Sequence, residues 1–159
     1  MTNAHSFSFT SIEGKPLPMK SFKGTAVLVV NTASRCGLTP QYKGLETLWQ
    51  SRKDKGLVVL GVPSNDFGAQ EPGNESQIQD FCQVRYGVDF PLTNKQRVVG
   101  KEAHPLYQWI AGELGEAAVP KWNFHKYLIG KDGSILGTFG SRTEPDAPEL
   151  VQEIDKAIK

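Results

Sequence analysis

Residues Thr25–Thr32 read Thr-Ala-Val-Leu-Val-Val-Asn-Thr, and the fold can be worked out from this stretch. Its central run, Val27–Val30, is short, apolar and rich in β-branched side chains, which predicts a buried strand. Thr39–Pro40 then predicts a helix start, because Thr can cap a helix and Pro suits its first position. A second apolar strand is expected over Leu57–Val62. A strand, a helix and a strand in this order predict a right-handed crossover in a parallel sheet.

The remaining elements extend this unit in both directions. Asn74, with Gln77 three residues later, resembles a capping box and predicts a helix that ends near Gly87. We also expect a hairpin within residues 1–24 and a last helix from near Asp146. A third helix is expected from His104, with four side chains directed inward: Leu106, Tyr107, Ile110 and Leu114. Two further strands are expected over Phe124–Ile129 and Ser134–Phe139, joined by the turn Gly130–Gly133. This order outlines an α/β thioredoxin-like fold, in which a central mixed β-sheet is flanked by helices. We expect one such domain over residues 1–159, with an N-terminal hairpin and a helical insertion over Asn74–Tyr86.

The composition limits the classes of function. A chain of 159 residues with 38% hydrophobic residues can bury one core without disulfides or metal. A formal net charge of +1 argues against a nucleic-acid or polyanion binder and against stable membrane association. Residues 1–10 lack the basic region and apolar run of a signal peptide, and no stretch of the sequence approaches bilayer length. We therefore expect a cytoplasmic protein, in which cysteines are usually reduced.

The two cysteines, Cys36 and Cys82, are too few for a disulfide framework. Cys36 follows the first buried strand and precedes a helix start. Free backbone N–H groups and the positive end of the helix dipole stabilise a thiolate there. The surrounding segment Asn31–Gly37 is polar and ends in glycine, which makes it a poor place for a core residue. The position therefore favours a nucleophilic Cys36 over a buried one.

Three cysteine chemistries compete at this site, and each lacks a residue that it needs. A thioredoxin-type disulfide exchanger has a second Cys three positions later, where this chain has Thr39. A typical peroxiredoxin has Thr three positions before its Cys, where this chain has Ala33. A zinc site needs clustered Cys or His, and the three histidines, His5, His104 and His125, share no ligand spacing. We expect no metal and no cofactor.

Three motifs resemble the signatures of the glutathione peroxidase family. Asn31–Thr39, which reads NTASRCGLT, resembles the active-site signature of that family. Phe67–Pro72 (FGAQEP) resembles the second signature and Lys121–Phe124 (KWNF) resembles the third, in the same order and with the same spacing. The resemblance extends from about Phe7 to the final helix. It implies a thioredoxin-type fold and a thiol-dependent peroxidase that reduces hydroperoxides.

The catalytic group of the family is a Cys or selenocysteine with Gln, Trp and Asn, and the motifs carry it over to Cys36, Gln70, Trp122 and Asn123. The two amides and the indole supply neutral N–H donors that can hold a thiolate and orient a peroxide. Taken singly, Trp122 is an ordinary core aromatic, Gln70 an ordinary loop residue and Asn123 an ordinary turn former. The joint match is what supports a catalytic role for them.

One segment departs from the family pattern. The second motif of the family often begins Pro-Cys-Asn-Gln-Phe-Gly, whereas Pro63–Gly68 reads PSNDFG. Ser64 removes a cysteine that is not part of the catalytic group. Asp66 replaces an amide with a carboxylate, whose negative charge would disfavour a thiolate if it lay near Cys36.

A sulfenic acid formed at Cys36 has to be reduced by another thiol. Members of the family that resemble the selenium enzymes use glutathione, whereas many cysteine members use a resolving cysteine and then thioredoxin. Cys82, within Phe81–Pro91, matches the resolving position. It also shares an apolar helix face with Ile78 and Phe81, where a core cysteine is common. A helical, inward Cys82 would have to leave its helix before a disulfide formed, since the two Cα atoms must come within about 7 Å.

The segment between Gly115 and Lys121 is too short for the insertion that accompanies tetramers and glutathione use in the family. The resemblance therefore implies a monomer or weak dimer that takes electrons from thioredoxin, with glutathione as the alternative reductant. Two other interpretations remain open. One is a peroxide sensor that passes oxidation from Cys36 to a partner protein, and the other is a non-catalytic thioredoxin-fold binding module.

Overall fold

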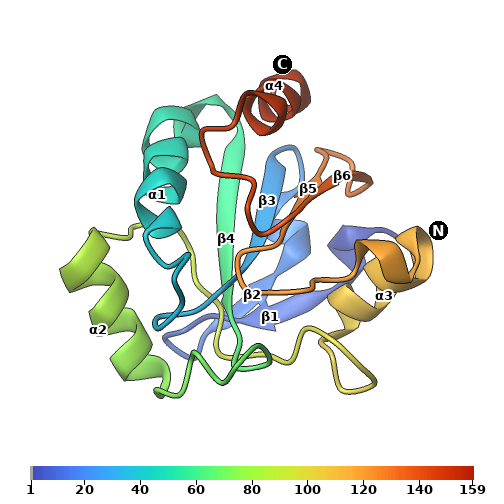
Figure 1. Ribbon diagram of the computed structural model, residues 1–159. Coiled ribbons are helices and arrows are strands. Elements are labelled where there is room, and N and C mark those ends of the chain that lie inside the picture. Colours follow the sequence, from blue (N-terminus) through green and yellow to red (C-terminus); the bar gives the residue numbers. More distant parts are fainter. Residues whose placement is uncertain (1) are drawn as a thin grey trace.

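The computed structural model describes residues 2–159 and is built around a four-stranded sheet in the order β4-β3-β5-β6 (Figure 1). Strand β3 (Ala26–Thr32) is parallel to β4 (Leu57–Pro63) and antiparallel to β5 (Lys126–Ile129). Strand β6 (Ile135–Phe139) pairs antiparallel with β5. The expected mixed central sheet is confirmed. Met1, the first residue of the expected domain, lies outside the described residues.

Both faces of the sheet are covered. Leu28 and Val30 of β3 face a core shared with three helices, whereas Val27 and Val29 face a second core. This alternation is the two-residue period of a strand, and burial of all seven β3 residues explains its continuous apolar run. The first face is covered by α1 (Gln41–Arg52), α2 (Glu75–Tyr86) and α4 (Pro148–Ala157), and the second by α3 (Pro105–Leu114) and the hairpin of β1 (Ser8–Thr10) and β2 (Pro16–Pro18) (Figure 1). Short 3-10 segments occupy Ala4–Ser6, Met19–Phe22, Lys53–Lys55 and Glu116–Ala118.

The local stop and start signals of the sequence are confirmed at most element ends. Asn74 and Gln77 form a reciprocal capping box at the start of α2. Gly87 ends that helix with φ 61°, a left-handed conformation that favours glycine. The ring Nδ1 of His104 accepts a hydrogen bond from the N–H of Leu106 and so caps α3. These ends set where the loops that carry the site begin.

Several details differ from the sequence expectation. Strand β5 begins at Lys126 and not at Phe124, because Phe124 has a left-handed φ of 65°. Helix α1 begins at Gln41, and the side chain of Thr39 bonds within the preceding turn instead of capping the helix. Leu114 is 39% exposed, because it is the last residue of α3 and the chain leaves the helix at Gly115. Among the helices of residues 2–159, none has both the length and the apolar character to cross a membrane.

Candidate active site

Cys36 lies in the run of turns that connects β3 to α1, and its residue is 8% exposed. Its Sγ accepts a hydrogen bond from the backbone N–H of Leu38 at 3.3 Å. The N–H of Cys36 donates to Oγ1 of Thr39 at 3.0 Å, and this hydroxyl donates to the carbonyl of Ala33 at 2.8 Å. The sulfur is thus held in a turn whose backbone N–H points at it, as the strand-to-helix position predicts. The sequence could not show whether Thr39 would make these two hydrogen bonds or cap the helix, because Thr is suited to both roles.

Gln70 and Asn123 come together from two distant loops. Nδ2 of Asn123 donates to Oε1 of Gln70 at 3.0 Å, and Asn123 is fully buried. The backbone carbonyl of Gln70 accepts a hydrogen bond from the N–H of Arg35 at 3.0 Å. The loop of Gln70 is therefore tied to the residue directly before Cys36.

Trp122 completes the set expected from the sequence. Together with Cys36 it lines a pocket of about 460 Å³, whose other walls are Gly37, Leu38, Ser141 and Arg142. Its ring centroid lies 5.9 Å from that of Phe67, and 36% of Trp122 is exposed. Cys36 and Trp122 therefore open onto the same pocket. The structure thus brings Cys36, Gln70, Trp122 and Asn123 into one region.

Backbone strain marks both amide-bearing loops. Ala69 (φ 51°) and Phe124 (φ 65°) are the two non-glycine residues with positive φ among residues 2–159. Each adjoins one of the paired amides, since Ala69 precedes Gln70 and Phe124 follows Asn123. Such conformations cost on the order of 1–3 kcal/mol and concentrate at functional sites. The sequence motifs contain these residues but do not reveal their conformation.

A buried lysine supports the same pocket and was missed by the sequence analysis. Lys126 on β5 is fully buried, and its Nζ donates to Oε1 of Gln41 at 2.6 Å and to the carbonyl of Ser141 at 3.3 Å. Nε2 of Gln41 also donates to the carbonyl of Ser141, at 2.8 Å. Burial lowers the pKa of Lys126 to about 7, partly opposed by the carboxylate of Glu144. Lys126 thereby joins the start of α1 to the loop that forms one wall of the pocket.

Asp66 does not act on the sulfur as a free charge. Its carboxylate pairs with the guanidinium of Arg97 and accepts hydrogen bonds from the N–H groups of Val98, at 2.7 Å, and Val99, at 3.3 Å. The side chain is 5% exposed. The carboxylate that replaces the usual amide is therefore satisfied by the segment of Arg97.

Cys82 lies on the inner face of α2 and is fully buried. Burial raises the pKa of the Cys82 thiol to about 11, with the hydroxyl of Tyr42 partly opposing this effect and Glu71 adding to it. Both cysteines are free thiols within the described chain. In this conformation Cys82 is a protonated core residue, as its helical spacing predicts.

Comparisons with known proteins identify the relatives of this chain. The family model for glutathione peroxidase matches residues 4–111. The chain is 46% identical to "Glutathione peroxidase" of Lactococcus lactis subsp. cremoris, covering 98% of this chain and 99% of the relative. It is 45% identical to "Glutathione peroxidase-like peroxiredoxin GPX5" of Chlamydomonas reinhardtii, covering 97% and 95%, and 48% identical to "Hydroperoxy fatty acid reductase Gpx2" of Synechocystis sp., covering 95% and 96%.

Solved structures show the same relationship. The apo form of Trgpx superposes with a TM-score of 0.79 at 38% identity, covering 99% of this chain and 97% of that one. A thioredoxin-family thiol:disulfide interchange protein from Chlorobium tepidum shares the fold, with a TM-score of 0.74 at 17% identity and coverage of 99% and 97%. Fold and site therefore define a thiol-dependent peroxidase of thioredoxin-like architecture, which takes a peroxide substrate and a thiol reductant. The chain belongs to the glutathione peroxidase family.

Proposed function

We propose that the chain, as one domain over residues 1–159, reduces hydrogen peroxide and organic or lipid hydroperoxides to water or alcohols with Cys36 as the nucleophile. The observation that carries this proposal is the hydrogen bond from the N–H of Leu38 to the Cys36 sulfur at the pocket shared with Trp122. A neutral donor aimed at sulfur favours the thiolate, which is the form that attacks a peroxide.

In the first step the thiolate of Cys36 attacks one peroxide oxygen, an S–O bond forms, and the O–O bond breaks. The leaving oxygen takes a proton and departs as water or an alcohol, and Cys36 becomes a sulfenic acid. Gln70, Trp122 and Asn123 supply the N–H donors for the developing charge. The contact between Gln70 and Asn123 supports a shared role, because it couples the two amides.

In the second step Cys82 attacks the sulfenic acid, the S–O bond of Cys36 breaks and water leaves. The resulting intramolecular disulfide is then reduced by thioredoxin. Relatives named as glutathione peroxidase-like peroxiredoxins support this route over direct use of glutathione. The short segment between Gly115 and Lys121 supports a monomer or weak dimer. The cytoplasmic location expected from the sequence stays a prediction.

The test is the steady-state rate of peroxide reduction, measured on one sample with thioredoxin, thioredoxin reductase and NADPH, and separately with glutathione, glutathione reductase and NADPH. We expect turnover with thioredoxin and only slow turnover with glutathione. The Cys36→Ser variant is the blank for both assays. Fast glutathione turnover with no response to thioredoxin would contradict the proposed reductant.

A further inference from the structure

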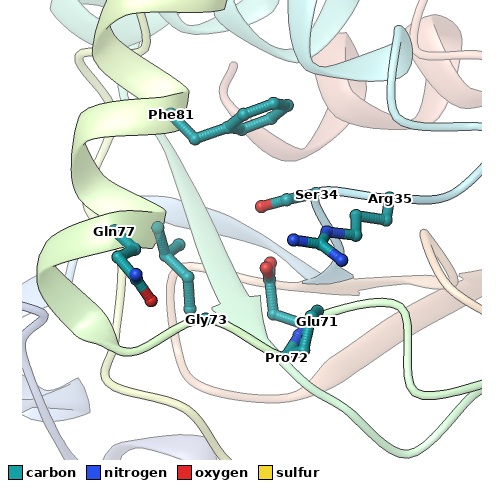
Figure 2. Close-up of a pocket in the computed structure, with 8 residues that line it drawn as sticks. Ser34, Arg35, Glu71, Pro72, Gly73, Gln77 and Phe81 are labelled. Atoms are coloured by element: carbon teal, nitrogen blue, oxygen red, sulfur yellow. The ribbon is translucent and has the colours of Figure 1, made fainter.

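A second cavity separates the loop that precedes Cys36 from helix α2, which carries Cys82. Its volume is about 220 Å³, and its walls are distinct from those of the pocket at Trp122. On one side lie Ser34, Arg35 and Glu71, and on the other Gln77 and Phe81 of α2 (Figure 2). Ile78, also on α2, lines the same cavity. The cavity therefore lies between the two segments that carry the cysteines.

Glu71 is the buried acid of this cavity. It is 1% exposed, and its N–H donates to Oδ1 of Asn65 at 2.9 Å, which fixes its backbone. Figure 2 shows its carboxylate directed toward Ser34 and Arg35. Within residues 2–159, neither Oε2 of Glu71 nor Oγ of Ser34 has a hydrogen-bond partner. A buried carboxylate oxygen without a hydrogen-bond partner lowers the stability of the folded protein. Buried titratable groups of this kind are found most often at functional sites.

Charged and titratable groups face Glu71 from several elements. Burial raises the pKa of Glu71 to about 6, while Ser34 and the positive charges of Lys95 and Arg35 partly oppose the rise. From α1, Tyr42 stays protonated at neutral pH, because burial raises its pKa well above the usual value. Glu71 is therefore ionised near neutral pH, and it is more basic than an exposed carboxylate.

The opposite wall leads directly to the second thiol. Ile78 lies one helical turn before Cys82 and Phe81 directly precedes it, so an opening of this part of α2 releases Cys82 beside the cavity. Burial raises the pKa of the Cys82 thiol to about 11 while α2 is closed, and an exposed thiol, with a pKa of roughly 8.5, is still mostly protonated near neutral pH. Cys82 is therefore a poor nucleophile until a base removes its proton. The carboxylate of Glu71, in the wall of this cavity, can serve as that base.

We propose that this cavity receives Cys82 when α2 opens, and that Glu71 is the base that takes the thiol proton as Cys82 attacks the sulfenic acid of Cys36. The S–S bond forms, the S–O bond of Cys36 breaks, and the hydroxyl leaves as water after gaining a proton, which Glu71 can return. No net proton or electron is consumed in the step. This inference rests on the resolving role of Cys82 proposed above.

The experiment follows disulfide formation directly. Reduced protein receives one equivalent of hydrogen peroxide, thiols are alkylated at successive times, and intact mass separates sulfenic acid from disulfide. In the Glu71→Gln variant we expect sulfenic acid to form at the normal rate and disulfide to form about 100-fold more slowly. Glu71→Asp should recover part of the rate. Glu153→Gln, the same chemical change at a surface site on α4, should have no effect.

The pH dependence of disulfide formation separates a proton-transfer role of Glu71 from a purely structural one, because only the former changes that dependence. Between about pH 5 and about pH 7.5, disulfide formation in the unchanged protein should accelerate as Glu71 ionises, and Glu71→Gln should lose this dependence. A normal disulfide rate in Glu71→Gln, or a flat profile in the unchanged protein, would overturn the proposal. Full thioredoxin-dependent cycling by Cys82→Ser would instead overturn the resolving step on which it rests.

Discussion

Nδ2 of Asn123 donates a hydrogen bond to Oε1 of Gln70 at 3.0 Å, although 53 residues separate these side chains in sequence. This contact orients both amides. Because Oε1 of Gln70 accepts from Asn123, its Nε2 is the end that remains to donate elsewhere. One interaction therefore determines which end of Gln70 can serve as a donor for charge that develops near Cys36.

The amide pair should act as a unit in catalysis. We expect Gln70→Ala and Asn123→Ala each to lower kcat/KM for peroxide by about 100-fold, because each removes a positioned donor. The double variant should lose much less than the product of the two effects, since either change breaks the same pair. Steady-state peroxidase kinetics measure this coupling, with the exposed Gln152→Ala on α4 as the control. Independent, additive losses would argue against a paired role.

Thr39 should matter for the turn that holds the sulfur. In Thr39→Val the N–H of Cys36 and the carbonyl of Ala33 both lose their hydroxyl partner, at nearly constant side-chain shape. We expect the free energy of unfolding to fall by about 1–3 kcal/mol and sulfenic acid formation to slow. Urea unfolding and single-turnover peroxide kinetics test the two effects. Thr47→Val, which removes an exposed hydroxyl on α1, should change neither.

Replacement of each cysteine by Ser should stop the reaction at a different step. Cys36→Ser should abolish peroxide consumption, because it removes the nucleophile. Cys82→Ser should consume one equivalent of peroxide and then stop as a sulfenic acid, which mass spectrometry after dimedone trapping detects. A Cys36→Ser protein that still reduced peroxide would contradict the assignment of the nucleophile.

Helix α2 should open when the disulfide forms. Cys82 is fully buried within Glu75–Tyr86, and a disulfide needs the two Cα atoms within about 7 Å. We expect faster hydrogen exchange over residues 75–86 in peroxide-treated protein than in reduced protein, with β3 unchanged as an internal reference. Equal exchange of α2 in both states would speak against the opening.

His125 should make the protein sensitive to acid. Burial, together with the charges of Lys126 and Lys121, lowers the pKa of His125 to about 4, and its Nε2 lies 2.7 Å from Oγ1 of Thr138. The unfolded state therefore binds more protons than the folded state between about pH 6.5 and about pH 4, so stability falls as the pH falls through this window. We expect His125 to account for a loss of about 2–3 kcal/mol.

The His125 effect is isolated by comparison with His125→Gln, which keeps an amide able to reach Thr138. Urea unfolding at about pH 7 and about pH 4.5 should show a smaller difference for the variant. The comparison is needed because Glu71 acts in the opposite direction. Its raised pKa means that the folded state gains protons first as the pH falls through about 6. An equal pH dependence in both proteins would contradict the role of His125.

Sequence patterns that extend over only a few residues were sufficient to predict much of the fold. The capping box of Asn74 and Gln77, the left-handed stop at Gly87 and the hairpin turn at Gly133, with φ 85°, all depend on neighbours along the chain. The position of Cys36 between a strand and a helix start could be predicted in the same way, because the elements on either side of it are encoded locally. Its role as nucleophile stays a prediction. Leu114 was misplaced, because a periodic pattern does not show where a helix leaves its core.

The arrangement of the site depends on contacts between distant segments. No local pattern reveals that Lys126 joins Gln41 to Ser141, that Asp66 is neutralised by Arg97, or that Glu71 is buried without a partner for one oxygen. Desolvation and pairing set the charge state of each group, and both arise only when remote parts of the chain pack together. The residue order thus predicted most of the elements and the proposed nucleophile, whereas packing established the electrostatic environment of the site.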